Sequence, residues 1–250
     1  MEAVGRLATA RATGVPCAPV RDTVRDVAAA YAVQSAWVAD RVAAGARVVG
    51  RKIGLTHHAV RAQLGVDEPD FGFLLDDMAY GSGARVDVTP LLQPKAEAEI
   101  AFVLGADLDA ADIGPADVVG QVVAALEIVD SRIADWDITI VDTVADNASA
   151  GVFVLGADPV PLSELDLPAC AMTMWRHDDV VSKGSGADCM GDPLRAVAWL
   201  ARTAHQLGAP LRAGDVVLSG ALGPVVPIVA GDVFRAEITG IGTVSAEFRS

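Results

Sequence analysis

The pattern of apolar and polar positions divides the chain into a helical beginning and a strand-rich remainder. Residues 22–44 repeat apolar side chains at helical spacing, with Asp22 and Thr23 as candidate N-caps, and therefore predict an amphipathic helix. The compact, β-branched stretch 46–55 predicts a strand, and residues 57–65 predict a short helix.

From about residue 86 onward, the period of the apolar positions changes to two. The runs are separated by Gly, Pro, Asn and Asp, and a long helix is predicted in this half only over 193–208. Because strands cluster without regular alternation with helices, we expect an α+β fold with a strand-rich, mixed β-sheet assembly. The predicted strands cover 97–104, 122–129, 151–155, 170–176, 214–219, 225–229 and 232–248.

The chain shows no internal repeat and no low-complexity linker, so its 250 residues suit one large domain. The change of pattern near residue 50 predicts a subdomain seam at most. We expect a mainly helical N-terminal segment over 1–50 and a strand-rich domain over 51–250 that carries the functional site.

Composition restricts the possible partners and surroundings of the chain. An apolar content of 52% and a mean hydropathy of +0.39 exclude a disordered protein and predict burial between subunits in a homo-oligomer. A net charge of −14 repels the phosphates of nucleic acids and anionic membranes, so we expect neither as a partner. The beginning of the sequence lacks the apolar stretch of a secretory signal, and the apolar run 216–231 is broken by Gly and Pro. These features predict a cytoplasmic protein.

Cysteine and histidine give no sign of a structural metal site or a disulfide framework. Cys17, Cys170 and Cys189 are scattered without a CxxC pair, and the four histidines form no HExxH motif. We therefore interpret the three cysteines as small buried hydrophobic residues.

Lysine is scarce, since only three of the 19 basic residues are lysines. A lysine kept in such a chain is a candidate for a place that needs an amine and not a guanidinium. Lys95 and Lys183 stand in polar surroundings and are interpreted as ordinary surface cations. Lys52 differs because it lies inside the apolar stretch 46–55.

Three glutamates require a positive partner. Glu97 and Glu99 lie on one face of a strictly alternating strand, with their backbone positions about 7 Å apart. Glu127 stands alone in the apolar run 122–129, where an isolated carboxylate costs several kcal/mol unless it is neutralised or coordinated.

One divalent ion would satisfy all three carboxylates if their strands are neighbours. Ligation by oxygen alone favours Mg²⁺ or Mn²⁺ over zinc, and three protein oxygens would leave positions for a chelating substrate. The alternative is that Glu97 and Glu99 line a solvated strand face and that Glu127 pairs with an arginine such as Arg132.

Two further patterns leave their role open. Residues 129–156 mix Asp, Asn, Ser and Thr with apolar residues, which is typical of a hydrogen-bonded loop network that forms either a pocket wall or a turn system. The glycine-rich stretches 81–84, 183–191 and 219–224 do not open a helix after a strand, so we interpret them as turns and not as phosphate-binding loops.

Several long motifs resemble one enzyme family over about residues 20–248. In chain order they are GRKIGLTHHAVRAQLGVDEPDFGFLLDDM, LLQPKAEAEIAFVLG, ALEIVDSRIADWDITIVDTVADNAS and LSGALGP. They are similar to the 2-hydroxypenta-2,4-dienoate (2-keto-4-pentenoate) hydratases of the fumarylacetoacetate hydrolase superfamily. The resemblance implies a strand-rich fold of that type after a small helical segment, a homo-oligomer, and a role in the meta-cleavage pathways of aromatic degradation.

The resemblance also implies roles for particular residues. Glu97, Glu99 and Glu127 match the family's ligands of Mg²⁺ or Mn²⁺, the same three residues that the charge argument selects. Lys52 matches the lysine of the GxKIGL motif, and Asp77 matches the acid before Met in the LxxDM segment. We expect Lys52 and Asp77 to carry the proton transfers, although their division of labour stays open and Asp77 could instead cap a turn.

The implied reaction adds water to a 2-hydroxydienoate, through its 2-oxo acid form, to give 4-hydroxy-2-oxopentanoate. Protonation at C5 and conjugate addition of water at C4 need proton transfers and an electron sink, which a cation beside the 2-oxygen supplies. Weaker candidates for holding the substrate are Asn147, Ser149 and Ser219.

Two other activities and one inactive state compete with this interpretation. A 2-oxo-3-hexenedioate (4-oxalocrotonate) decarboxylase would use the same metal but needs an extra cation for a second carboxylate. Carbon–carbon hydrolysis by a His–Glu dyad is disfavoured, because His57 and His58 are followed by no H-x-x-E pair. A non-catalytic homologue is disfavoured by the intact lysine and acidic residues.

Overall fold

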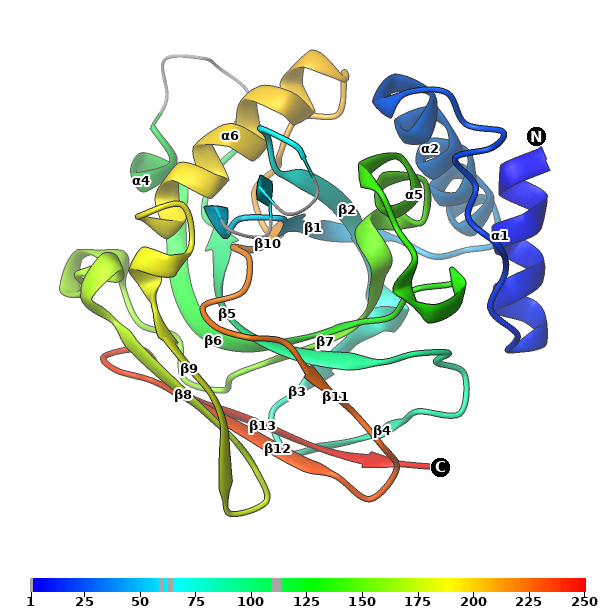
Figure 1. Cartoon of the computed structure of the whole chain (residues 1–250). Helices are drawn as coiled ribbons and strands as arrows, with labels where there is room; N and C mark the ends of the chain where they lie inside the picture. Colours follow the sequence, from blue (N-terminus) through cyan, green and yellow to red (C-terminus); the bar gives the residue numbers. More distant parts are fainter. Residues whose placement is uncertain (1, 59–60, 63–64, 109–113) are drawn as a thin grey trace.

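Two β-sheets pack together, and helices cover one end and one side of the assembly in the computed structural model (Figure 1). The structure describes residues 2–58, 61–62, 65–108 and 114–250. This mixture of strands and helices confirms the predicted α+β fold class.

The larger sheet is mixed and strongly curved, and it surrounds the interior of the molecule (Figure 1). Its strand order is β2-β1-β10-β5-β6-β7-β3, and β11 pairs with β5. The β1–β10 and β3–β7 pairs are parallel and the others are antiparallel. The strands are β1 Val48–Gly54, β2 Asp70–Leu75, β3 Ala79–Gly81, β5 Lys95–Leu104, β6 Val119–Val129, β7 Ala150–Leu155, β10 Val216–Leu218 and β11 Val226–Pro227.

The smaller sheet packs against the outer face of the larger one and closes the main hydrophobic core. Its strand order is β4-β13-β12-β8-β9. Every second residue of β12 and β13 is buried against the larger sheet, Phe234 and Phe248 among them, which is the pattern of a sheet with one covered face. The strands are β4 Ala84–Asp87, β8 Ala171–Arg176, β9 Asp179–Ser185, β12 Val233–Ile238 and β13 Gly242–Arg249.

Strand β5 separates the core from the functional interior. Because side chains alternate along a strand, Ile100 and Phe102 enter the core between the sheets, whereas Glu97, Glu99 and Ala101 lie on the opposite face. The strict alternation of the sequence thus aims both glutamates into the space that the curved sheet surrounds.

Helices α1, α2 and α5 gather at one end, and α6 covers the side of the core (Figure 1). Helix α2 begins after Asp26, whose carboxylate accepts the amide of Ala29, so the predicted caps Asp22 and Thr23 are wrong. Asp22 instead pairs with Arg6 of α1. The helices are α1 Glu2–Thr13, α2 Val27–Ala43, α4 Pro115–Val118, α5 Ile140–Ala145 and α6 Pro193–Gln206.

Short 3-10 turns join several of these elements: η1 Asp76–Met78, η2 Ala134–Trp136, η3 Asn147–Ser149, η4 Leu162–Glu164, η5 Leu167–Ala169 and η6 Gly186–Asp188. The predicted strands and both long helices each overlap an observed element. The sequence patterns missed the helices α1, α4 and α5 and the strands β2, β3, β4 and β9. The start of the glycine-rich stretch 183–191 belongs to β9 and is not a turn. Of the helix expected over 57–65, residues 59–60 and 63–64 lie outside the described residues.

Within the described part of the chain, the helices are too short or too polar to cross a lipid bilayer.

Candidate active site

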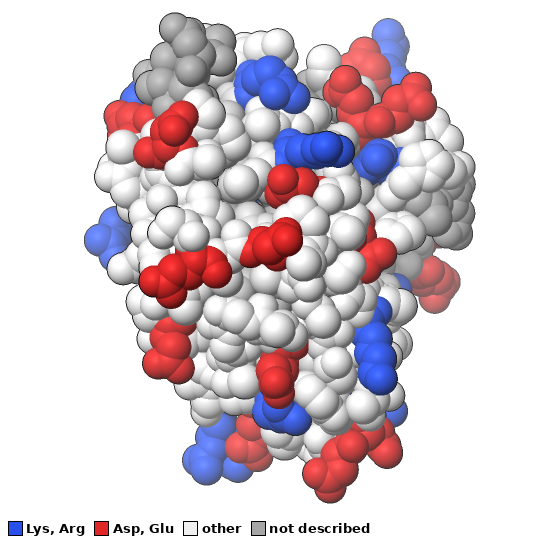
Figure 2. Space-filling view, turned by 90° about the vertical axis from the view of Figure 1, so that its left-hand side faces the viewer, with Lys and Arg blue, Asp and Glu red and all other residues white. Residues whose placement is uncertain are grey.

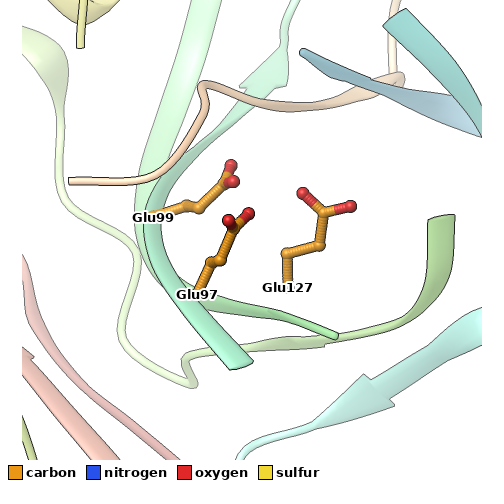
Figure 3. A group of neighbouring side chains, drawn as sticks. All are labelled: Glu97, Glu99 and Glu127. Atoms are coloured by element: carbon orange, nitrogen blue, oxygen red, sulfur yellow. The ribbon is translucent and has the colours of Figure 1, made fainter. Parts of the chain in front are cut away.

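Three glutamates from two neighbouring strands point into one space (Figure 3). Glu97 of β5 lies directly opposite Glu127 of β6, and Glu99 is two residues further along β5. One carboxylate oxygen from each lies within 4.8 Å of the others. The structure therefore brings together the three acids that the sequence selected, and the register of the β5–β6 pair is the cause.

This cluster is poorly satisfied by the protein alone. Glu99 Oε2 accepts the backbone amide of Gly220 at 2.8 Å, but Glu99 Oε1 and both carboxylate oxygens of Glu127 have no aligned hydrogen bond. Burial and the charge of Glu127 raise the pKa of Glu97 to about 7 and the pKa of Glu99 well above its usual value. Buried oxygen atoms that lack hydrogen bonds and mutual repulsion of the carboxylates are what a divalent cation would relieve, so the donor set fits Mg²⁺ or Mn²⁺.

Lys52 lies beside the glutamates. The β-branched stretch around it forms β1, which delivers its ammonium into the interior with only 3% of the side chain exposed. Its Nζ is 3.0 Å from Glu127 Oε1. Glu127 therefore pairs with Lys52 and not with Arg132, the alternative partner expected from the sequence. Arg132 is bound to Asp146 instead. Burial lowers the pKa of Lys52, but the surrounding carboxylates outweigh burial and raise this pKa overall.

Asp70 joins this group and was missed by the sequence reasoning. It opens β2, is buried, accepts a hydrogen bond from Thr143 Oγ1 at 3.2 Å, and leaves its Oδ1 without a partner. Burial raises the pKa of Asp70, and Lys52 opposes that shift. Gly54 lies opposite Asp70 in the β1–β2 pair, where a Cβ would collide with Asp70 Oδ1 and lie 3.6 Å from Lys52 Nζ. A glycine is needed there because the aspartate occupies the space.

Asp77 does not lie in the site. It belongs to the surface turn η1, its side chain is 57% exposed, and it forms an ion pair with Arg41 of α2. Its neighbour Asp76 binds Arg47. The expectation that Asp77 works beside Lys52 is therefore corrected, because Asp77 lies on the surface while Asp70 lines the same cavity as Lys52.

Of the three weaker candidates for substrate binding, one lines the cavity and two do not. Ser149 is buried, lines the cavity and has a hydroxyl without a hydrogen-bond partner. Asn147 does not offer its amide to the cavity, because its side chain binds both the N–H and the C=O of Phe73. Ser219 Oγ bonds to the carbonyl of Gly220 and does not line the cavity, although the amide of Gly220 holds Glu99.

The polar groups open onto a cavity of about 210 Å³. Among its lining residues, Lys52 and Asp70 are buried, whereas Lys95 and Trp136 are half-buried. The wall is mainly apolar. The remaining lining residues are Ile53, Gly54, Leu55, Thr56, His57, Glu97, Val129, Ile138, Thr143, Ala148, Ser149, Ala221 and Val225.

Comparison with known proteins identifies the class. Residues 46–249 match the fumarylacetoacetate (FAA) hydrolase C-terminal family. The chain is 55% identical to 2-keto-4-pentenoate hydratase of Paraburkholderia xenovorans (strain LB400), over 100% of this chain and 94% of that protein. It is 47% identical to 2-hydroxyhexa-2,4-dienoate hydratase of Comamonas testosteroni, over 90% of this chain and 86% of that protein.

The fold is also similar to that of a solved structure. The 4-oxalocrotonate decarboxylase from Pseudomonas putida G7, complexed with magnesium and adipate, superposes with a TM-score of 0.93 at 33% identity over 99% of this chain and 96% of that chain. The chain therefore belongs to the fumarylacetoacetate hydrolase family, as its motifs predicted. Within the family, several relatives with 50–55% identity are 2-keto-4-pentenoate hydratases, so the chain is an enzyme of the hydratase type.

Proposed function

We propose that this enzyme adds water to 2-hydroxypenta-2,4-dienoate (2-keto-4-pentenoate) and yields 4-hydroxy-2-oxopentanoate in the degradation of aromatic compounds. The hydratase relatives support the reaction. The observation that carries the proposal in this chain is the placement of the buried Lys52 and Asp70 in the wall of a cavity that Glu97 also lines, with Lys52 paired to Glu127 of the glutamate cluster. That arrangement combines two proton-transfer groups with a site for a hard cation.

Glu97, Glu99 and Glu127 would hold Mg²⁺ or Mn²⁺. Such an ion, when bound, supplies a Lewis acid that stabilises negative charge on the 2-oxygen of a 2-oxo acid. The solved decarboxylase relative is complexed with magnesium in one structure and with calcium in another, which supports a divalent ion here. Oxygen-only ligation favours Mg²⁺ or Mn²⁺ over zinc, and three protein oxygens suit an ion that keeps further positions for water or substrate.

Lys52 and Asp70 would move the protons. The ammonium of Lys52 is positioned by Glu127 and can give a proton to C5 of the substrate. The free Oδ1 of Asp70, oriented through the bond from Thr143 to Oδ2, can accept a proton from the water that adds to C4 and pass it to C3. The proton that the 2-hydroxyl group loses can return to Lys52. The unpartnered hydroxyl of Ser149 is placed to bind a substrate oxygen.

Turnover of the dienoate tests the proposal. We expect the absorbance of 2-hydroxypenta-2,4-dienoate to fall when enzyme and Mg²⁺ are added, and a chelator to stop the loss. The same preparation is assayed with 2-oxo-3-hexenedioate, the decarboxylase substrate, which we expect to react much more slowly. Release of CO₂ from the hexenedioate without hydration of the dienoate would replace the proposal by the decarboxylase activity.

We also propose the setting of this activity. The net charge of −14 argues against nucleic acid and membrane partners, and we place the enzyme in the cytoplasm, acting on a small 2-oxo acid. On one face of the molecule, basic side chains stand singly or in small groups among acidic ones, with uncharged residues covering the surface between them (Figure 2). The high mean hydropathy supports a homo-oligomer. We keep the division into a helical segment over 1–50 and a catalytic domain over 51–250.

A further inference from the structure

Lys95 is a second lysine of the cavity, and the proton transfers do not use it. It opens β5 two residues before Glu97, on the same face of the strand, and it lines the cavity half-buried. Its Nζ lies 3.9 Å from the centre of the Trp136 ring. In the described part of the chain, no carboxylate lies within ion-pair distance of this ammonium. The interpretation of Lys95 as an ordinary surface cation therefore does not hold.

The ring beneath Lys95 is fixed by the neighbouring backbone. Trp136 Nε1 donates to the carbonyl of Gln93 at 3.2 Å. The side chain of Gln93 in turn donates to the carbonyls of Ser131 and Ile133 and accepts the amide of Asp135. Trp136 also has a φ of 55°, a conformation that persists only when its surroundings enforce it and that clusters at ligand sites. The loop thus holds an aromatic platform on which the ammonium rests.

The arrangement of charges gives the cavity a direction. Lys52 and Asp70 are buried. In the proposed reaction they act at C5, which gains a proton, and at C4, where the added water loses one, and both carbons are far from the carboxylate. Lys52 is level with Ala101 of β5 through Leu218 of β10. Lys95 lies six residues before Ala101, so the carboxylate is left on the side of Lys95. A carboxylate has two oxygens, so one can face the glutamate cluster and its cation while the other accepts a hydrogen bond from an ammonium.

We propose that Lys95, supported by Trp136, binds the carboxylate of the substrate and orients its unsaturated chain toward Lys52 and Asp70. This inference rests on the proposed function and adds the orientation of the substrate. It gives Lys95 the role of binding the substrate, which is separate from metal binding by the glutamates and from the proton transfers.

Binding of an unreactive 2-oxo acid tests the inference. We measure the affinity of 2-oxohexanoate for the Mg²⁺-loaded protein by calorimetry and expect Lys95→Met to weaken it by about tenfold to a hundredfold, the loss of one hydrogen bond to a charged group. Lys95→Arg should recover most of the affinity. Lys183→Met, which removes an exposed lysine of β9, is the matched control and should bind as the unaltered protein does. Ligand binding should also change tryptophan fluorescence, and Trp136→Phe should remove that change.

A ligand with a second carboxylate separates this inference from its main rival. If Lys95→Met weakens 2-oxoadipate but leaves 2-oxohexanoate unaffected, Lys95 binds the far end of longer substrates and the proposed orientation is wrong. Equal affinities for 2-oxohexanoate in the unaltered protein and in Lys95→Met also overturn the inference. Failure of the hydratase proposal would be recognised separately, as a protein that binds 2-oxohexanoate with help from Lys95 but leaves the dienoate unchanged.

Discussion

At the scale of single residues, neighbouring carboxylates keep Lys52 protonated, although burial alone would favour the neutral amine. The attraction of Glu127, Asp70 and the other carboxylates exceeds the effect of burial and raises the pKa of Lys52. In the proposed reaction, Lys52 would donate a proton as an ammonium and Asp70 would accept one. A guanidinium at the same place would keep the charge but could not release a proton.

Replacement of Lys52 by arginine separates charge from proton transfer. We expect Lys52→Arg to fold and to lose at least about a hundredfold in kcat, since general acid catalysis contributes this much or more. Steady-state kinetics with the dienoate measure the loss, and circular dichroism verifies the fold. Lys183→Arg, the same change at a surface position, is the control. Near-normal turnover of Lys52→Arg would show that Lys52 does not transfer a proton in the reaction.

The two aspartates of the β2 segment form a second matched pair. Asp70→Asn should lower kcat by about a hundredfold or more because the proton acceptor is lost. Asp77→Asn should change kcat less than about twofold, because only an exposed ion pair with Arg41 is removed. The opposite result in the same kinetic assay would restore Asp77 to the site and exclude Asp70.

On the scale of elements, the turn η3 shapes the wall of the cavity. Its residues Asn147, Ala148 and Ser149 have φ values of 58°, 49° and 53°, a left-handed conformation that side chains other than glycine adopt at a cost. Two sets of bonds hold it. Asn147 binds Phe73 of β2 through both ends of its amide, and Asp146 is bound by Arg132. The strain is thus balanced by hydrogen bonds, and the hydroxyl of Ser149 is left facing the cavity.

Stability and activity should separate at this turn. Asn147→Ala removes two hydrogen bonds and places alanine in the left-handed region, so we expect the free energy of unfolding to fall by about 2–3 kcal/mol. Ser149→Ala removes only an unpartnered hydroxyl and should keep or raise the free energy of unfolding while it raises KM for the dienoate. Urea unfolding and steady-state kinetics on both variants measure these effects. A large loss of stability in Ser149→Ala would show that the hydroxyl supports the fold.

Sequence patterns predicted the elements that depend on local periodicity. The glutamate cluster was predictable because a strand places every second residue on one face, and the alternation at 95–105 is strict. The choice between Asp70 and Asp77 was not, because it depends on how β2 pairs with Gly54 of β1. Helix α1 was missed because its apolar positions are few and its stability comes from packing on α2.

On the scale of the whole molecule, the free energy of unfolding depends on pH through the buried glutamates. Burial that raises the pKa of Glu97 to about 7 favours the protonated, folded form when no ion is bound. The stabilising contribution of Glu97 is therefore complete below the usual pKa of a glutamate and is lost as the pH rises through about 7. A cation reverses this because it needs the ionised carboxylates.

The stabilisation by Mg²⁺ should consequently grow with pH. We expect the rise in Tm on adding a fixed concentration of Mg²⁺ to be small at pH 6 and clearly larger at pH 8, measured by differential scanning fluorimetry. Glu97→Gln, which removes one of the two glutamates with a raised pKa, should weaken this dependence. A Mg²⁺-induced rise in Tm that shrinks with increasing pH would contradict the linkage.

Direct titration of the metal-free protein with Mn²⁺, followed by electron paramagnetic resonance of the free ion, tests the central claim that one cation joins the three glutamates. We predict one tight site per chain, and a loss of affinity of at least about tenfold in each of the variants Glu97→Gln, Glu99→Gln and Glu127→Gln. The matched change Glu164→Gln, on the surface turn η4, should leave the titration unchanged. Binding of Mn²⁺ with unaltered affinity and stoichiometry in the three variants would contradict the account.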